Sequence, residues 1–80
     1  MKCQLITPEK ILFEGEASYV SVPGSEGEFG VLDGHAPLIS TLKEGVVGIE
    51  LASGEKKEFS VVSGVAEVTP ARCTLLVSSL

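Results

Sequence analysis

Short segments in which apolar and polar residues alternate, separated by turn residues, constrain this chain more than any other feature. Alternation puts successive side chains on opposite faces of a β-strand, so each segment can bury one face. No segment carries apolar residues at positions i, i+3, i+4 and i+7 over three turns, the spacing of an amphipathic helix. The expected strands are residues 2–7, 10–14, 17–22, 28–32, 37–42, 46–51, 56–62, 65–69 and 73–77.

The turn residues between these segments predict how the strands connect. Gly15 is expected to end the second strand, Ala52-Ser53-Gly54-Glu55 to form a hairpin turn, and Ser63-Gly64 to form a bulge or corner. The 80 residues make one domain, 1–80. About ten short strands in so short a chain must close on themselves, which predicts an all-β fold, a small antiparallel β-sandwich or flattened barrel.

The stretch 22–45, VPGSEGEFGVLDGHAPLISTLKEG, holds five of the nine glycines, two of the four prolines and the only histidine. Apolar residues such as Phe29, Val31 and Leu38 run through it, so it must fold back onto the core. Glycine and proline at this density indicate a segment with one definite shape. Shaped loops on a rigid scaffold are common functional sites.

The charge distribution limits the possible partners. The net charge is −5, which argues against a nucleic-acid partner because phosphates require a basic surface. No Lys or Arg occurs between Lys10 and Lys43, whereas Glu14, Glu16 and Asp33 fall in that interval with two more glutamates. This is either a solvated acidic surface or a patch that faces a polar or basic partner. No apolar run is long enough to span a bilayer and no signal peptide is evident, so we expect a soluble protein that is not exported.

Cys3 and Cys73 lie near the two ends of the chain. A disulfide is conceivable if the terminal strands lie side by side, but without an export signal two reduced, buried thiols are favoured. Two cysteines 70 residues apart and a single histidine do not form a zinc site.

Motifs that could carry catalysis are incomplete. The glycines at 24, 27 and 30 superficially resemble a phosphate loop, but they lack the Gly-x-Gly spacing, the loop contains no lysine and precedes no helix, and Glu26 and Glu28 would repel a phosphate. His35, near Asp33 and these glutamates, could be part of a metal or acid–base site, but a hydrogen bond that caps its turn, or an interface role, is favoured. No serine has a catalytic context. We therefore expect no catalytic residue, metal or cofactor.

Several motifs closely resemble the N-terminal domain of the ε subunit of F-type ATP synthases, which is called δ in mitochondria. The most specific are SEGEFGVL (25–32), GHAPL (34–38) and LKEG (42–45). The resemblance extends along the whole chain, through LITP (5–8), FEG (13–15) and FSVVSG (59–64).

The resemblance implies a non-catalytic rotor subunit of the central stalk, which links the γ subunit to the c-ring and supports coupling of proton flow to ATP synthesis. It implies a peripheral location at the cytoplasmic face of the bacterial inner membrane, as part of the complex. By the family pattern, Glu28, with Glu26 beside it, would face the c-ring, whereas Thr7, His35 and Ser40 would face γ. The structural positions of the loop would be Gly27, Gly30, Gly34, Pro37 and Gly45.

Two departures from the family pattern are visible. Family members commonly continue into a helical hairpin that restrains ATP hydrolysis, whereas this chain ends at Leu80, as a naturally short ε or an excised domain. Asp33 stands where proline is frequent. The alternative is a stand-alone β-sandwich that binds a small ligand or a protein. A stalk subunit should present an apolar strip and a separate acidic loop, whereas a ligand module should have a pocket lined by aromatic residues.

Overall fold

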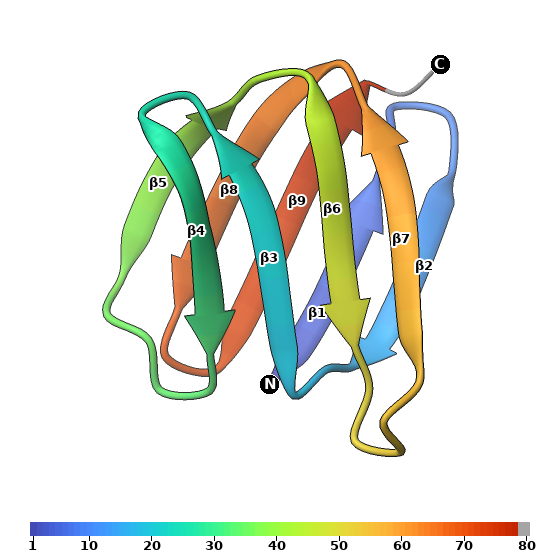
Figure 1. The fold of residues 1–80 in the computed structure, drawn as a ribbon, viewed down its shortest axis with the longest axis vertical. Coiled ribbons are helices and arrows are strands. Elements are labelled where there is room, and N and C mark those ends of the chain that lie inside the picture. Colours follow the sequence, from blue (N-terminus) through green and yellow to red (C-terminus); the bar gives the residue numbers. More distant parts are fainter. Residues whose placement is uncertain (79–80) are drawn as a thin grey trace.

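The computed structural model describes residues 1–78, which form nine β-strands and no helix (Figure 1). This part of the chain therefore has no helix that could cross a membrane. The all-β prediction is confirmed; the segment after Ser78, where a helical hairpin was not expected, lies outside the described residues. The strands are β1 (Lys2–Ile6), β2 (Ile11–Glu16), β3 (Tyr19–Gly24), β4 (Gly27–Leu32), β5 (Leu38–Leu42), β6 (Gly45–Glu50), β7 (Lys56–Val61), β8 (Ser63–Thr69) and β9 (Arg72–Ser78).

The strands form two layers that share one continuous sheet. Their order is β2-β1-β9-β8-β5-β3-β6-β7, and β4 pairs with β3. Between β5 and β3 only Gly24 and Leu42 are paired, so the sheet folds over at that point. Strands β2, β1, β9, β8 and β5 form the first layer, and β4, β3, β6 and β7 form the second, which is nearer the viewer in Figure 1. The predicted sandwich or flattened barrel is thus confirmed.

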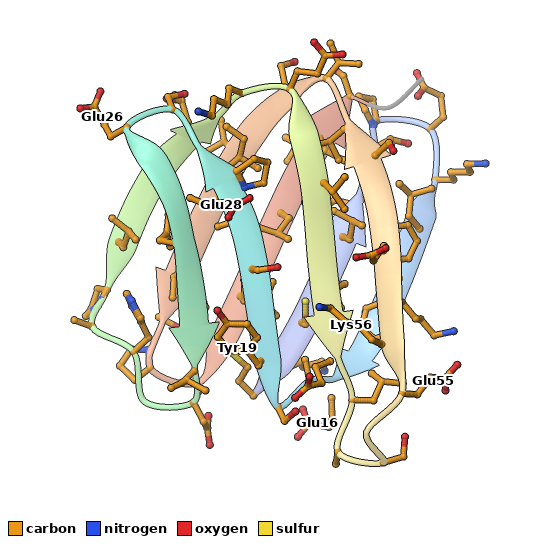
Figure 2. The ribbon with its side chains drawn as sticks, in the orientation of Figure 1. Glu16, Tyr19, Glu26, Glu28, Glu55 and Lys56 are labelled. Atoms are coloured by element: carbon orange, nitrogen blue, oxygen red, sulfur yellow. The ribbon has the colours of Figure 1, made fainter. Side chains whose placement is uncertain are left out.

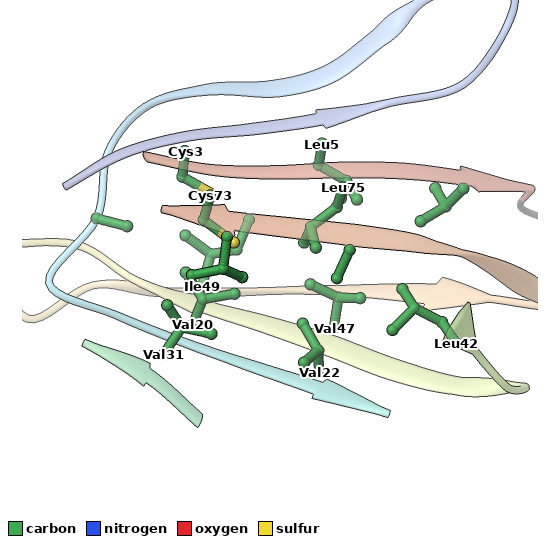
Figure 3. Packing of buried hydrophobic residues seen from close by; sticks show 14 of the residues in the cluster. Cys3, Leu5, Val20, Val22, Val31, Leu42, Val47, Ile49, Cys73 and Leu75 are labelled. Carbon is green, nitrogen blue, oxygen red and sulfur yellow. The ribbon is translucent and has the colours of Figure 1, made fainter. Parts of the chain in front are cut away.

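Short aliphatic side chains fill the space between the layers (Figure 3). Alternate residues point inward, as the period-two pattern predicted: Leu5 from β1, Val20 from β3 and Ile49 from β6 are fully buried. Cys3 and Cys73 lie opposite each other on β1 and β9, and both are buried free thiols. No polar or charged residue among residues 1–78 is buried, so the core is held by apolar packing alone.

The pairing differs from the prediction in three places. β1 pairs with β9 in parallel, so the sheet is not wholly antiparallel. β2 does not end before Gly15, because Gly15 and Glu16 pair with β1 and the ladder extends the strand through the glycine. β8 begins at Ser63, which places the corner at Val62. Gly64 is needed within β8, because a Cβ there would lie 2.5 Å from the carbonyl oxygen of Leu76.

Candidate functional site

The acidic part of the 22–45 stretch is a tight hairpin turn between β3 and β4. The two strands are paired as far as Gly24 and Gly27, so Ser25 and Glu26 alone form the turn. Figure 2 shows Glu26 projecting from the tip, whereas Glu28 lies over the outward face of the second layer. Both carboxylates are exposed, and neither forms an ion pair with another residue in the range 1–78. The hairpin therefore presents negative charge that is free to meet a polar or basic partner.

Hydrogen bonds to β5 fix the position of this acidic turn. The backbone N–H of Ser25 donates to the carbonyl of Thr41 at 2.9 Å, and the hydroxyl of Thr41 donates to that of Ser25 at 2.8 Å. The N–H of Lys43 donates to the carbonyl of Pro23 at 2.9 Å. The turn is thus held on the edge of the first layer.

The loop between β4 and β5 contains the histidine. Gly34 has φ of 83°, a left-handed conformation that favours glycine, and its N–H donates to the carbonyl of Pro70 at 2.7 Å. His35 is half-buried, and its Nδ1 lies 2.7 Å from the carbonyl oxygen of Ala36, to which it can donate. This is the backbone hydrogen bond expected of a turn histidine. No group of three metal-ligating side chains occurs in the described part of the chain.

Of the structural positions predicted in the loop, Gly27 and Gly30 lie in β4, and Gly45 begins β6. Gly34 and Pro37 lie in the loop between β4 and β5. Much of the stretch is therefore strand, and only the tight turn and this loop are irregular.

The three residues expected to face γ do not form one cluster. Thr7 was predicted to lie in the first strand, but β1 ends at Ile6 and Thr7 lies in the turn that follows. There its hydroxyl accepts a hydrogen bond of 3.1 Å from the N–H of Lys10. Ser40 is in β5, half-buried, with its hydroxyl donating to the carbonyl of Thr41. The β1–β2 turn and the β4–β5 loop lie at opposite ends of the sandwich (Figure 1), so Thr7 and His35 are at opposite ends of the first layer.

Between these two ends, the outward face of the first layer carries an apolar strip, which we define as Ile6, Ile11, Ile39, Val65 and Leu76. Four of its residues form one row across β8, β9, β1 and β2, because they are direct partners in the strand register. Ile39 on β5 is 71% exposed and Leu76 is 47% exposed. Contiguous apolar surface is uncommon on a monomer and usually marks an interaction site.

A shallow pocket of about 360 Å³ lies within the strip. Ile6, Ile39, Val65 and Leu76 line it together with two polar residues, Glu67 and Thr74. In the register, Glu67 lies opposite Ile39 on one side and opposite Thr74 on the other. The lining is aliphatic rather than aromatic, as suits a side chain from a protein partner.

An apolar strip is expected of a stalk subunit, but its residues were not predicted, although the sequence carries a signal for one of them. The run Leu75-Leu76-Val77 is apolar at consecutive positions, so one of its members must face outward in a strand. Leu75 and Val77 are buried and Leu76 is exposed.

Comparison with known proteins identifies the same family in the family models and among the individual relatives. The family model of the ATP synthase delta/epsilon chain, beta-sandwich domain, matches residues 1–80. The ATP synthase epsilon chain of Parvibaculum lavamentivorans is 44% identical over 72 residues, which cover 90% of this chain and 54% of the relative. That of Mesorhizobium japonicum is 42% identical over 78 residues, 98% of this chain and 58% of the relative. The chain thus spans a little over half the length of these relatives.

Two solved structures share the fold. A chain in the cryo-EM structure of the Euglena gracilis mitochondrial ATP synthase, OSCP/F1/c-ring, matches with a TM-score of 0.87 at 23% identity, over 94% of this chain and 48% of that one. A chain in the central stalk and c-ring structure of the Tetrahymena thermophila mitochondrial ATP synthase matches with a TM-score of 0.82 at 16% identity, over 99% and 63%. Motifs, fold and relatives agree, and the chain belongs to the delta/epsilon chain family of ATP synthase, as a beta-sandwich domain of that family.

Proposed function

We propose that this chain is the β-sandwich part of a central-stalk subunit of an F-type ATP synthase. In this role it links the γ subunit to the c-ring and catalyses no reaction itself. The observation that carries the proposal is the pair of separate surfaces, the apolar strip on the first layer and the acidic turn at the tip of β3 and β4. A linking subunit needs two such surfaces.

The apolar strip is the surface proposed for γ. Burying an aliphatic side chain fully contributes about 1.5–3 kcal/mol. Four of the five strip side chains are about half-exposed in the free domain. Burying their exposed parts against γ would together contribute roughly 3–6 kcal/mol, before the entropic cost of association. Thr7 and His35 lie at the two ends of this face, so both can lie at the border of the same interface. Ser40 follows Ile39 on β5 and is paired with the buried Ala66, so its side chain points to the opposite face of the sheet.

The acidic turn is the surface proposed for the c-ring. Glu26 extends into solvent at the tip, and hydrogen bonds to Thr41 hold the turn in place. Exposed carboxylates on a fixed turn suit the polar loops of a partner, where they add orientation and association rate more than affinity. The domain would therefore be peripheral to the membrane, at the cytoplasmic face of the bacterial inner membrane, and would support the coupling of proton flow to ATP synthesis.

The pocket favours this function over a stand-alone ligand-binding module. A ligand module should bind its ligand in a concave pocket rich in aromatic residues. The pocket on the strip is shallow, and aliphatic side chains with one threonine and one glutamate line it.

Co-purification tests the proposal. The tagged chain should retain the γ subunit, with the α and β subunits bound to it, when all are expressed together. Leu76→Ser in the strip should reduce the recovery of γ. Val46→Ser is the matched control, because Val46 is 46% exposed on β6 of the second layer and Leu76 is 47% exposed. Equal recovery of γ with both variants would contradict the assignment of the strip.

A further inference from the structure

Glu67 is the one charged residue that lines the pocket of the apolar strip. Its β8 position lies between Ile39 on β5 and Thr74 on β9, and Val65 is the next outward residue on its own strand. No ion pair within residues 1–78 involves Glu67. The strip thus contains a carboxylate that has no cationic partner in its own chain.

Other carboxylates on the same face have a donor nearby. Glu14 on β2 accepts a hydrogen bond of 2.6 Å from the side-chain amide of Gln4 on β1. Glu16 lies opposite Lys2 in the strand register. The cation nearest to Glu67 in register is Arg72, a diagonal neighbour across β8 and β9, and it forms no ion pair with the glutamate. Glu16 likewise forms no ion pair with Lys2, so Glu67 differs from these carboxylates in lining the apolar pocket and in having neither a cation nor a hydrogen-bonded amide directly opposite it in the register.

A partner that covers the strip removes water from this carboxylate. An ionised carboxylate transferred out of water without a compensating charge or hydrogen bond is strongly unfavourable. If only aliphatic side chains covered the pocket, this cost would oppose the gain from burying the strip. A cation in the partner segment removes the cost and turns the glutamate into a determinant of specificity.

We propose that Glu67 selects a segment of the γ subunit in which a Lys or Arg side chain lies among aliphatic side chains, and that this cation pairs with Glu67 in the pocket. The inference rests on the proposed function, because it takes γ as the partner that covers the strip. Arginine suits the site better than lysine, since its planar guanidinium can donate two parallel hydrogen bonds to a carboxylate and is more weakly hydrated. Thr74, opposite Glu67 on β9, is the other polar residue that lines this pocket.

Calorimetric titration of the 80-residue chain into α, β and γ subunits purified together from the same organism tests the inference. Glu67→Gln keeps the size of the side chain and removes its charge. It should weaken binding by about 30-fold or more, which corresponds to about 2 kcal/mol. Glu58→Gln is the matched control, because Glu58 is an exposed glutamate on β7 of the second layer. This control variant should change the affinity by no more than about twofold, which corresponds to about 0.4 kcal/mol of binding free energy.

A third variant, Leu76→Ser, separates this inference from the proposed function. Loss of binding with Leu76→Ser but unchanged binding with Glu67→Gln would overturn the cation pair and leave the docking of γ on the strip intact. Unchanged binding with both variants would overturn the strip as the γ surface, and with it the inference. Thermal unfolding of each variant is the control and should show that the fold is retained.

A double-mutant cycle identifies the partner cation. Each basic residue of γ is changed to Met, alone and combined with Glu67→Gln. One of these changes should weaken binding to the wild-type chain and cause little further loss with Glu67→Gln. Fully additive losses for every basic residue of γ would contradict a direct ion pair.

Discussion

Gly64→Ala should destabilise the domain, because two strands of the first layer approach each other closely at this residue. A Cβ at position 64 would lie 2.5 Å from the carbonyl oxygen of Leu76 and 3.0 Å from Cα of Val77. Both atoms belong to the backbone of β9, which is held between β8 and β1 and cannot shift cheaply. Overpacking of this kind costs about 1–3 kcal/mol. For a domain of this size, 2 kcal/mol lowers Tm by roughly 8–16 °C.

Gly15→Ala is the control for this prediction. Gly15 is also a strand glycine of the first layer, but a Cβ there would make only an ordinary contact, 3.4 Å from the ring of Phe13. Replacing a glycine at a permissive position stabilises by about 0.4–1 kcal/mol, since the unfolded chain loses freedom. Thermal unfolding followed by circular dichroism should give a lower Tm for Gly64→Ala and an equal or higher Tm for Gly15→Ala. A Gly64→Ala variant as stable as the wild type would refute the close-approach argument.

Three further predictions concern the acidic turn, the histidine and the buried thiols. Glu28→Lys should weaken ATP-driven proton pumping in the reconstituted synthase while changing stability by no more than about 0.5 kcal/mol; unchanged pumping would count against a c-ring contact. His35→Ala should lower the affinity for γ without loss of a metal, and elemental analysis that finds stoichiometric zinc or iron in the wild type would disprove this. The hydrogen bond with Cys73, and then burial, raise the pKa of the Cys3 thiol, whereas the same hydrogen bond lowers the pKa of Cys73 against the opposing effect of burial. The contribution of Cys3 to stability is therefore complete below the unfolded pKa of about 8.5 and declines above it, by up to about 1.4 kcal/mol per pH unit. The decline at high pH comes from Cys3. Urea unfolding between pH 8 and 10 should show this decline in the wild type and not in the Cys3→Ser, Cys73→Ser double variant; parallel curves would contradict it.

Local geometry explains why the strands could be predicted. Alternation is a property of the extended backbone, so the burial of Leu5, Val20 and Ile49 follows from their parity within each strand. The hairpin of residues 51–55 is also local, and the structure closes it with the N–H of Leu51 donating to the carbonyl of Glu55 at 2.8 Å.

Pairing between distant segments could not be predicted in the same way. The parallel pair of β1 and β9 joins the two ends of the chain, and nothing near Cys3 in the sequence indicates that Cys73 lies opposite. Gly15 has a low intrinsic preference for a strand, but its pairing with Cys3 extends β2 through it. Such pairings depend on the closed fold rather than on local preference.

The candidate site also has one part that could be predicted from local sequence and one part that depends on the closed fold. The acidic turn was predictable because Glu26 and the flanking glycines are adjacent in sequence. The apolar strip draws one residue from each of five strands, and its outward orientation is known only once the layers have closed. Family resemblance indicated Thr7 and His35, which lie at the ends of the face, and gave no information on Leu76 or Val65 at its centre.

Strand β5 connects the two proposed interaction surfaces. Thr41 lies opposite Val65 of the apolar strip, and its hydroxyl donates to Ser25 in the acidic turn at 2.8 Å. The backbone of the same residue accepts from the N–H of Ser25 at 2.9 Å. In the proposed role, a force between γ and the c-ring would therefore pass from the strip to the turn through β5 and the hydrogen bonds that join it to the turn. Because backbone-paired strands in a close-packed domain deform little, this path suits a subunit that transmits torque rather than one that changes shape.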